Sequence, residues 1–184
     1  NPEFIRRIQE GDRSSADPNS PRNIINTFYY VPPFRAENEE DLLTASLQEK
    51  IGSDKYTGDS VPSTNWPFVG PGKWGPLNGG SGKYMINDVP NLIAVTPKPP
   101  ILWIRGDKDQ IVSDMSMFDI PTLGKFGFVP GYPGEEVYPP QPMVSQTRSV
   151  FGKYQKNGGN YKEIVLENTA HSPHIEKLAE FNLS

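Results

Sequence analysis

The chain has 184 residues, a formal net charge of -4 and no cysteine, and hydrophobic residues make up 35% of it. This length is enough for one domain with a buried core. The acidic balance, without a basic cluster, argues against nucleic-acid binding, and the lack of cysteine excludes disulfides and thiol chemistry. The 20 prolines and 17 glycines, with 11% aromatic residues, indicate an ordered protein that has long irregular segments.

The sequence carries no signal for a membrane or for export. No apolar run is long enough to span a bilayer, and the first residues lack the apolar core of a secretion signal. These features favour a cytoplasmic protein without a membrane partner. Because the sequence does not begin with Met, we expect it to start within a longer protein.

The N-terminal part predicts helices. Pro2 suits a first helical turn and Gly11 suits a helix end, so we expect a short helix within residues 1–10. Residues 24–31 fit a strand or the start of a helix, since their apolar positions do not separate the two periods. Acidic residues followed by leucines at helical spacing predict a helix over 36–51.

Residues 53–82 lack any regular period and predict a long irregular segment. In a compact domain such a segment is usually functional or a linker, and its aromatic rings favour a lid that packs down on the protein. We therefore expect Trp66, Phe68 and Trp74 to contact substrate. Each ring taken alone is equally compatible with a structural anchor.

The C-terminal part alternates strands and helices. It predicts a short helix over 84–95, interrupted at Pro90, and then a strand over 100–105. An irregular insertion over 113–142, a helix over 143–155, a strand over 161–167 and a final helix over 174–181 follow. Strand, helix, strand, helix is the order that builds a parallel sheet. The sequence therefore predicts an α/β fold.

Carboxylates follow the first of these strands directly. The strand contains a short apolar run, Ile101–Ile104, and Asp107 and Asp109 come just after it. In open α/β sheets, chemistry sits at the edge where strands end. We expect Asp107 to cap the turn and Asp109 to be the functional acid, with Asp114 as the reserve candidate.

The loop after the second strand carries His171, and His174 follows at the start of the last helix. Because both loops leave the same sheet edge, Asp109 can orient His171, which can then act as a general base. His174 is expected to be structural. Two histidines three residues apart, without cysteine, are too few ligands to predict a metal site, and no cofactor is expected.

The segments PPILWIRGDKDQIV and ENTAHSPHIEKLAEF resemble the acid loop and the histidine loop of the α/β-hydrolase superfamily. Members commonly carry Gly-x-x-Asp after the seventh strand and Gly-His near the C-terminus, followed by a helix with Glu and Phe. The resemblance implies that Asp109 is the triad acid and His171 the triad base, in the usual chain order after a nucleophile. The chain departs from the pattern at Ala170, where Gly is usual, and at Lys177-Leu178, where Pro is common.

The same resemblance implies that the first six strands and the nucleophile are outside this chain. It divides the chain into a lid or cap region, 1–97, and the C-terminal part of the hydrolase core, 98–184, with the last two parallel strands. Because these two strands alone would leave edges and an apolar face exposed, we expect an N-terminal segment to complete the sheet. One hypothesis is a proteolytic cut in or before the lid, after which both fragments stay associated as a heterodimer.

These features predict a hydrolase that cleaves an ester or similar acyl bond of a small apolar or aromatic substrate, with a serine nucleophile in the N-terminal fragment. An aspartate nucleophile would instead give an epoxide hydrolase or a dehalogenase, and a C–C hydrolase is a further alternative on the same triad. A non-catalytic ligand-binding protein on this fold is the alternative from another class.

Overall fold

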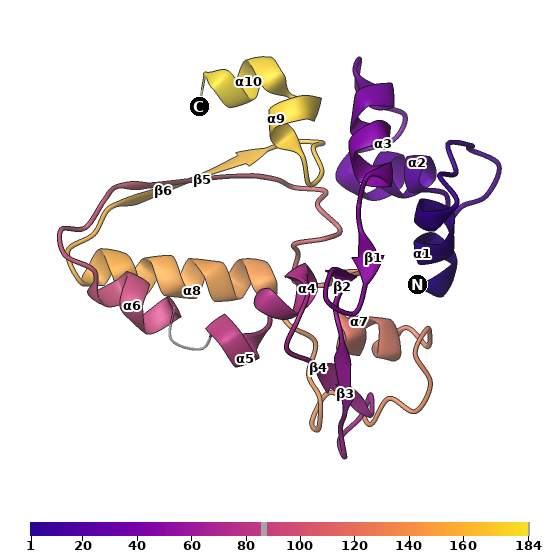
Figure 1. Cartoon of the computed structure of the whole chain (residues 1–184). Coiled ribbons are helices and arrows are strands. Elements are labelled where there is room, and N and C mark those ends of the chain that lie inside the picture. The colour runs from indigo at the N-terminus through magenta and orange to yellow at the C-terminus, as the bar shows by residue number, and fades with distance from the viewer. Residues whose placement is uncertain (86–87, 184) are drawn as a thin grey trace. The chain divides into compact units, whose positions relative to one another are not determined.

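The computed structural model describes residues 1–85 and 88–183, and it is a mixture of helices and short strands (Figure 1). The strands are β1 (Ile51–Gly52), β2 (Tyr56–Thr57), β3 (Ser60–Pro62), β4 (Val69–Pro71), β5 (Ile101–Gly106) and β6 (Tyr161–Leu166). They form two-stranded sheets in the order β1-β2, β3-β4 and β5-β6. The prediction of a mixed α/β fold is confirmed at this level.

The chain separates into two compact units. Unit 1 comprises Asn1–Ile51, Ile104–Asp109 and Ile164–Ser184, and unit 2 comprises Gly52–Trp103 and Gln110–Glu163. The assignment of 1–97 as a lid and 98–184 as a hydrolase core is a statement about function, and it stays a prediction.

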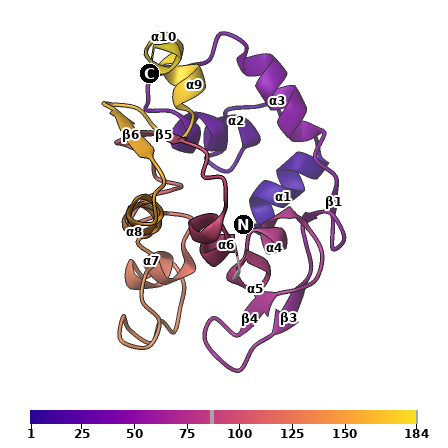
Figure 2. The ribbon, with the colours of Figure 1, turned by 90° about the vertical axis from the view of Figure 1, so that its left-hand side faces the viewer.

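Helices dominate unit 1. They are α1 (Pro2–Gln9), α2 (Pro21–Ile24), the π-helical turn η1 (Ile25–Tyr29), α3 (Glu39–Leu47), α9 (Pro173–Glu176) and α10 (Leu178–Asn182). The first three α-helices pack against one another, as Figure 2 shows. Their packing buries Ile8 and Leu43, which form part of the apolar core of this unit.

The helix predicted within residues 1–10 is confirmed as α1. The side chain of Asn1 accepts hydrogen bonds from the N–H groups of Glu3 and Phe4, which lack partners within the helix. Residues 24–31, which fitted either a strand or a helix, are helical as far as Tyr29. Ser20 caps α2, and the chain continues from α2 into η1. The helix predicted over 36–51 was too long, since α3 ends at Leu47 and Ile51 enters a strand.

Ion pairs join α2 to α3. Arg22 contacts Glu39 at 2.6 Å and Glu40 at 2.5 Å, and its guanidinium holds the pKa of Glu39 below the usual value. The amide of Asn26 also donates to Glu39, at 3.0 Å. The two helices are therefore fixed by polar contacts at one side and by the apolar core at the other.

The β5 and β6 strands run parallel. The Ile101 N–H donates to the Asn160 carbonyl at 2.9 Å, and the Asp107 N–H donates to the Leu166 carbonyl at 3.1 Å, so both strands advance in the same direction. The strands predicted over 100–105 and 161–167 are thus confirmed, with ends that differ by one residue. Parallel strands need a long crossover, which here contains helix α8 (Met143–Lys156).

Unit 2 contains more regular structure than the sequence predicts. Its other helices are α4 (Pro76–Gly79), α5 (Gly82–Met85), α6 (Asp88–Ala94) and α7 (Ile120–Lys125). The expectation that 53–82 is irregular throughout was wrong, because β3 and β4 form an antiparallel pair with Val61 opposite Gly70. Strands of three residues are too short to show the alternation of apolar and polar residues by which a strand is predicted. The insertion over 113–142 likewise contains α7.

Two predicted helices differ in detail. The helix expected over 84–95 includes residues 86 and 87, which lie outside the described residues, and α5 and α6 flank them. Pro90 lies in the first turn of α6, where its missing N–H costs no helical hydrogen bond. The final helix, expected as one piece over 174–181, is divided into α9 and α10 at Lys177, whose backbone is not helical (φ -131°, ψ 48°).

Helix α8 packs against the first residues of β5 and β6, which belong to unit 2 as α8 does (Figure 1). Phe151 packs between Trp103 and Tyr161, with ring centroids 5.7 and 5.3 Å apart. Tyr154 is fully buried, and its hydroxyl donates to the carbonyl of Pro99. The crossover helix is therefore fixed to the strand pair by aromatic packing.

No helix in the described part of the chain is both long and apolar enough to cross a membrane.

Asp119 organises the insertion around α7, and its removal should destabilise the fold. One carboxylate oxygen accepts from the Thr122 N–H at 3.0 Å, the Thr122 hydroxyl at 2.8 Å and the Gln141 N–H at 3.2 Å, and Asp119 is buried. We expect Asp119→Ala to lower the free energy of unfolding in urea by about 2 kcal/mol, since a helix cap is lost and a buried hydroxyl loses its partner. Asp119→Asn should recover most of this loss, and equal losses in both variants would contradict the role.

Candidate functional site

The backbone brings the loop after β5 against the loop after β6 within unit 1. The Lys108 N–H donates to the Thr169 carbonyl at 2.9 Å. A Cβ on Gly106 would lie 2.0 Å from the Thr169 carbonyl oxygen and 2.4 Å from that of Ala170. Glycine is therefore the only residue that fits this position without a shift of the backbone.

The close approach places Asp109 beside His171. The Nδ1 atom of His171 lies 3.0 Å from Oδ2 of Asp109. The Asp109 side chain is 9% exposed and that of His171 is 32% exposed, so the carboxylate is shielded while the imidazole reaches solvent. The sequence predicts this pairing, and the structure brings the two side chains together.

The contact fixes which nitrogen of His171 is available. An ionised carboxylate only accepts hydrogen bonds, so in the neutral form of the imidazole the Nδ1 that faces Asp109 carries the proton and Nε2 carries the lone pair. Within residues 1–85 and 88–183, Nε2 of His171 has no hydrogen-bond partner. The edge-to-face ring of Tyr29, with its centroid 5.5 Å away, packs against the imidazole. An imidazole oriented in this way can, in its neutral form, take a proton from a nucleophile and return it to a leaving group.

The other two candidate acids have structural contacts. The Thr169 N–H donates to Asp107 at 3.3 Å, so Asp107 ties the two loops together. Partial burial opposes ionisation of Asp107, but this N–H and the ammonium of Lys108 outweigh it and hold its pKa below the usual value. Asp114, in unit 2, accepts from the N–H and the hydroxyl of Ser145 at 2.9 and 2.6 Å and so caps the first turn of α8.

Glu176 positions the histidine loop, a role that the sequence did not reveal. One of its carboxylate oxygens accepts from the Ala170 N–H and the other from the Val31 N–H, both at 2.7 Å. A further bond runs from the Ser172 N–H to the Tyr29 carbonyl at 3.0 Å. The residues on both sides of His171 are therefore tied to the segment that follows α2. Glu176 belongs to the family-like motif, but its partner Val31 is far away in sequence, and no local pattern identifies that contact.

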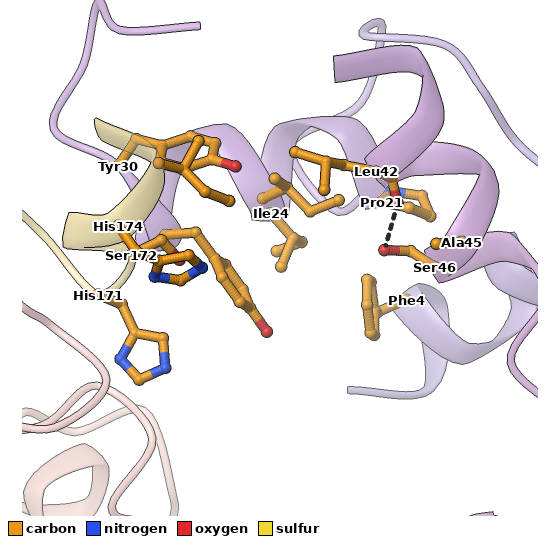
Figure 3. A pocket seen from close by; sticks show the side chains of 13 residues that line it. Phe4, Pro21, Ile24, Tyr30, Leu42, Ala45, Ser46, His171, Ser172 and His174 are labelled. Carbon is orange, nitrogen blue, oxygen red and sulfur yellow. Dashed lines mark hydrogen bonds between the residues drawn. The ribbon is translucent and has the colours of Figure 1, made fainter. Parts of the chain in front are cut away.

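A pocket of about 460 Å³ opens beside His171 in unit 1 (Figure 3). This volume is within the range of small-molecule sites. Helices α1, α2 and α3 contribute most of the apolar side chains of its lining, namely Phe4, Pro21, Ile24, Leu42 and Ala45, and Ile25 of η1 and Ile175 of α9 add to them. The structure therefore combines a partly exposed histidine with a mainly apolar pocket of small-molecule size.

His174 lines the same pocket, although the sequence predicts a structural role for it. Its ring packs edge-on against Phe181, with centroids 6.0 Å apart. Figure 3 shows His171 and His174 at one side of the pocket, with Phe4 and Ser46 at the other. The ring packing is consistent with a structural histidine that also forms part of the wall.

The three aromatic residues expected to contact substrate all belong to unit 2. Trp66 is buried, donates from Nε1 to the Pro130 carbonyl at 2.9 Å, and packs edge-on against Tyr132 and Tyr138. These contacts are those of an anchor. Phe68 and Trp74 are 65% and 53% exposed. A substrate role for the three rings stays a prediction.

Among the described residues, no group of three or more histidine, aspartate or glutamate side chains is arranged to hold a metal ion.

Comparison of the chain with models of known families, with curated proteins and with solved structures finds no match. Function must therefore be inferred from the geometry of the site.

Substitution of Gly106 should separate the two loops. We expect Gly106→Ala to lower the free energy of unfolding by about 1–3 kcal/mol, because the added methyl group meets backbone carbonyls that cannot rotate away. The control is Gly152→Ala in α8, where a methyl group meets nothing within 4 Å and the change should stabilise the helix by up to about 1 kcal/mol. Urea unfolding measures both variants. If they behave alike, the close approach does not constrain the site.

Removal of the Glu176 carboxylate should loosen the histidine loop locally. We expect Glu176→Ala to speed amide exchange at Val31 and Ala170 at least about tenfold, since each N–H loses a charged acceptor. Glu180→Ala is the control, because Glu180 is exposed and pairs with Lys177 at 3.2 Å. Hydrogen exchange followed by NMR reports both sites. Unchanged protection at Val31 and Ala170 in Glu176→Ala would contradict the positioning role.

Proposed function

We propose that this chain supplies the acid and the base of a hydrolase of the α/β-hydrolase type. His171 is the base and Asp109 is the acid that orients it. The reaction is cleavage of an ester or similar acyl bond in a small apolar or aromatic substrate. The observation that carries the proposal is the 3.0 Å contact between Nδ1 of His171 and Oδ2 of Asp109, which leaves Nε2 available. The chemistry of such a pair requires no cofactor.

The pocket supports this proposal because it lies beside the base. An acyl-transfer site needs a base next to a space that holds the group on one side of the reacting bond. The pocket of about 460 Å³ provides that space, and its lining is mainly apolar. Helices α1, α2 and α3 form much of its wall, which agrees with a covering role for the N-terminal region within the proposed lid, 1–97.

The nucleophile of the proposed reaction comes from a further segment that packs against this chain. Among the described residues no hydroxyl or carboxylate bonds to Nε2 of His171. The β5–β6 pair forms a two-stranded sheet, and Leu102 and Val165 on it are 51% and 41% exposed. A pair of strands alone is only marginally stable in water, so added strands would cover these side chains. We propose that the segment with these strands carries a serine nucleophile and that the two segments together form the active protein.

A non-catalytic ligand-binding protein is the second candidate. It is favoured by the same pocket, because an apolar pocket of this size binds a small molecule without any need for turnover. An aspartate nucleophile, as in epoxide hydrolases and dehalogenases, or C–C bond hydrolysis would use the same acid and base. These alternatives differ in their products, and an aspartate nucleophile also takes up oxygen from labelled water in its carboxylate. One set of assays therefore separates them.

The proposal is tested by substitution in the whole protein that contains this chain. We expect His171→Ala and Asp109→Asn each to lower kcat for a neutral p-nitrophenyl ester at least about a hundredfold, since the first removes the general base and the second removes the carboxylate that orients it. Asp114→Asn is the matched acid control and should stay within about twofold of the parent, because Asp114 contacts Ser145.

Three outcomes would contradict the proposal, either in its reaction or in its base. Binding of the ester without turnover in the parent protein would favour the binding protein. Turnover only of epoxides or haloalkanes, with oxygen from labelled water entering a protein carboxylate, would favour an aspartate nucleophile. Ester turnover that survives His171→Ala would exclude this histidine as the base.

A further inference from the structure

The pocket beside His171 differs from the binding surface that the sequence predicts. Its wall comes from the N-terminal helices and the histidine loop, and the expected Trp66, Phe68 and Trp74 do not line it. It lies within unit 1 together with the Asp109–His171 pair. The chemistry of this wall therefore indicates what kind of group can lie next to the base.

The charged residue types are missing from the part of the pocket wall that the described residues form. Its lining contains no lysine, arginine, aspartate or glutamate, and its polar groups come from serine, tyrosine and histidine. The Ser46 hydroxyl already donates to the Leu42 carbonyl at 3.0 Å, and Tyr30 is 2% exposed. A charged group placed against the far wall, away from His171 and His174, would lose its hydration without gaining a counter-charge, which is costly. The pocket therefore selects uncharged groups.

The arrangement of the wall sets a direction. Figure 3 shows the imidazole of His171 at one side and Phe4, Ala45 and Ser46 at the opposite side. A substrate whose reacting bond lies at His171 would extend its apolar part toward Phe4 and Ala45. The apolar side chains of Ile24 and Leu42 belong to the wall of the same pocket. The size of the side chains at positions 4 and 45 then limits how long that part can be.

We propose that this pocket binds the uncharged apolar chain or ring of the ester whose reacting bond lies at His171, and that Phe4 and Ala45 set its maximum length. The inference rests on the proposed function for the reaction, but the binding it describes can be measured without turnover. Each methylene buried in the pocket should raise affinity about fourfold until the chain reaches the far wall. A terminal carboxylate on the chain should abolish this gain.

The first experiment measures binding alone in the whole protein. The neutral fluorophore N-phenyl-1-naphthylamine is bound and then displaced by 1-butanol, 1-hexanol, 1-octanol and 6-hydroxyhexanoate. We expect the displacement constant to improve about fourfold per methylene among the alcohols. The charged 6-hydroxyhexanoate should bind at least about tenfold more weakly than 1-hexanol. Equal binding of these two compounds, or no saturable binding of the fluorophore, would overturn the proposal.

The second experiment changes the far wall. Ala45→Phe should weaken 1-octanol binding at least about tenfold, since Ala45 is exposed in the helix and a ring there enters the pocket. The matched control is Gln48→Phe, at an exposed position at the end of the same helix that does not line the pocket.

Phe4→Ala should increase the length of the alcohol at which affinity stops rising. Its control is Ile5→Ala, a half-buried neighbour on α1 outside the lining. Thermal unfolding of each variant establishes that it is folded.

The failure of this inference differs from the failure of the proposed function. If Ala45→Phe and Gln48→Phe bind 1-octanol equally while ester turnover still depends on His171, the pocket does not hold the apolar group and the reaction stands. If the alcohols bind as described and no ester is hydrolysed, the pocket assignment stands and the hydrolase proposal fails.

Discussion

The site depends on one steric constraint, the contact of Gly106 with the carbonyls of Thr169 and Ala170. A side chain at position 106 would occupy the space of those oxygens. Because the backbones meet there, the Lys108 N–H reaches the Thr169 carbonyl, and the next turn of each loop carries Asp109 and His171 to 3.0 Å from each other. Asp109 and His171 are thus positioned mainly by backbone geometry.

A second set of contacts connects this pair to the pocket. The Glu176 carboxylate joins the backbone before His171 to Val31, and the Ser172 N–H joins the backbone after it to Tyr29. The same segment supplies Tyr29, whose ring packs on the imidazole. It includes η1, a π-helical turn, and such turns often occur at functional sites. The orientation of the His171 ring and the shape of the pocket therefore depend on the same residues.

The sequence predicts those parts of the site that depend on local pattern. Apolar runs that end at Gly106 and before Asn168 identify the two strands, and parallel pairing then places Asp109 and His171 at one edge. Contacts between residues that are distant in the chain produce no local sequence pattern. The role of Glu176 and the pocket therefore could not be predicted from the sequence. Helix α3 was overestimated for a related reason, since pairing in a sheet removes Ile51 from the helix despite its helical spacing.

The central claim is that His171, oriented by Asp109, activates a nucleophile on a second segment. The most direct measurement is reaction of the whole protein with a neutral alkyl fluorophosphonate, followed by intact mass and peptide mapping under denaturing conditions. The account predicts one phosphonylated serine outside residues 1–184 in the parent protein, and loss of this label in His171→Ala. A label on a serine of this chain, or labelling that is unchanged by His171→Ala, would contradict it.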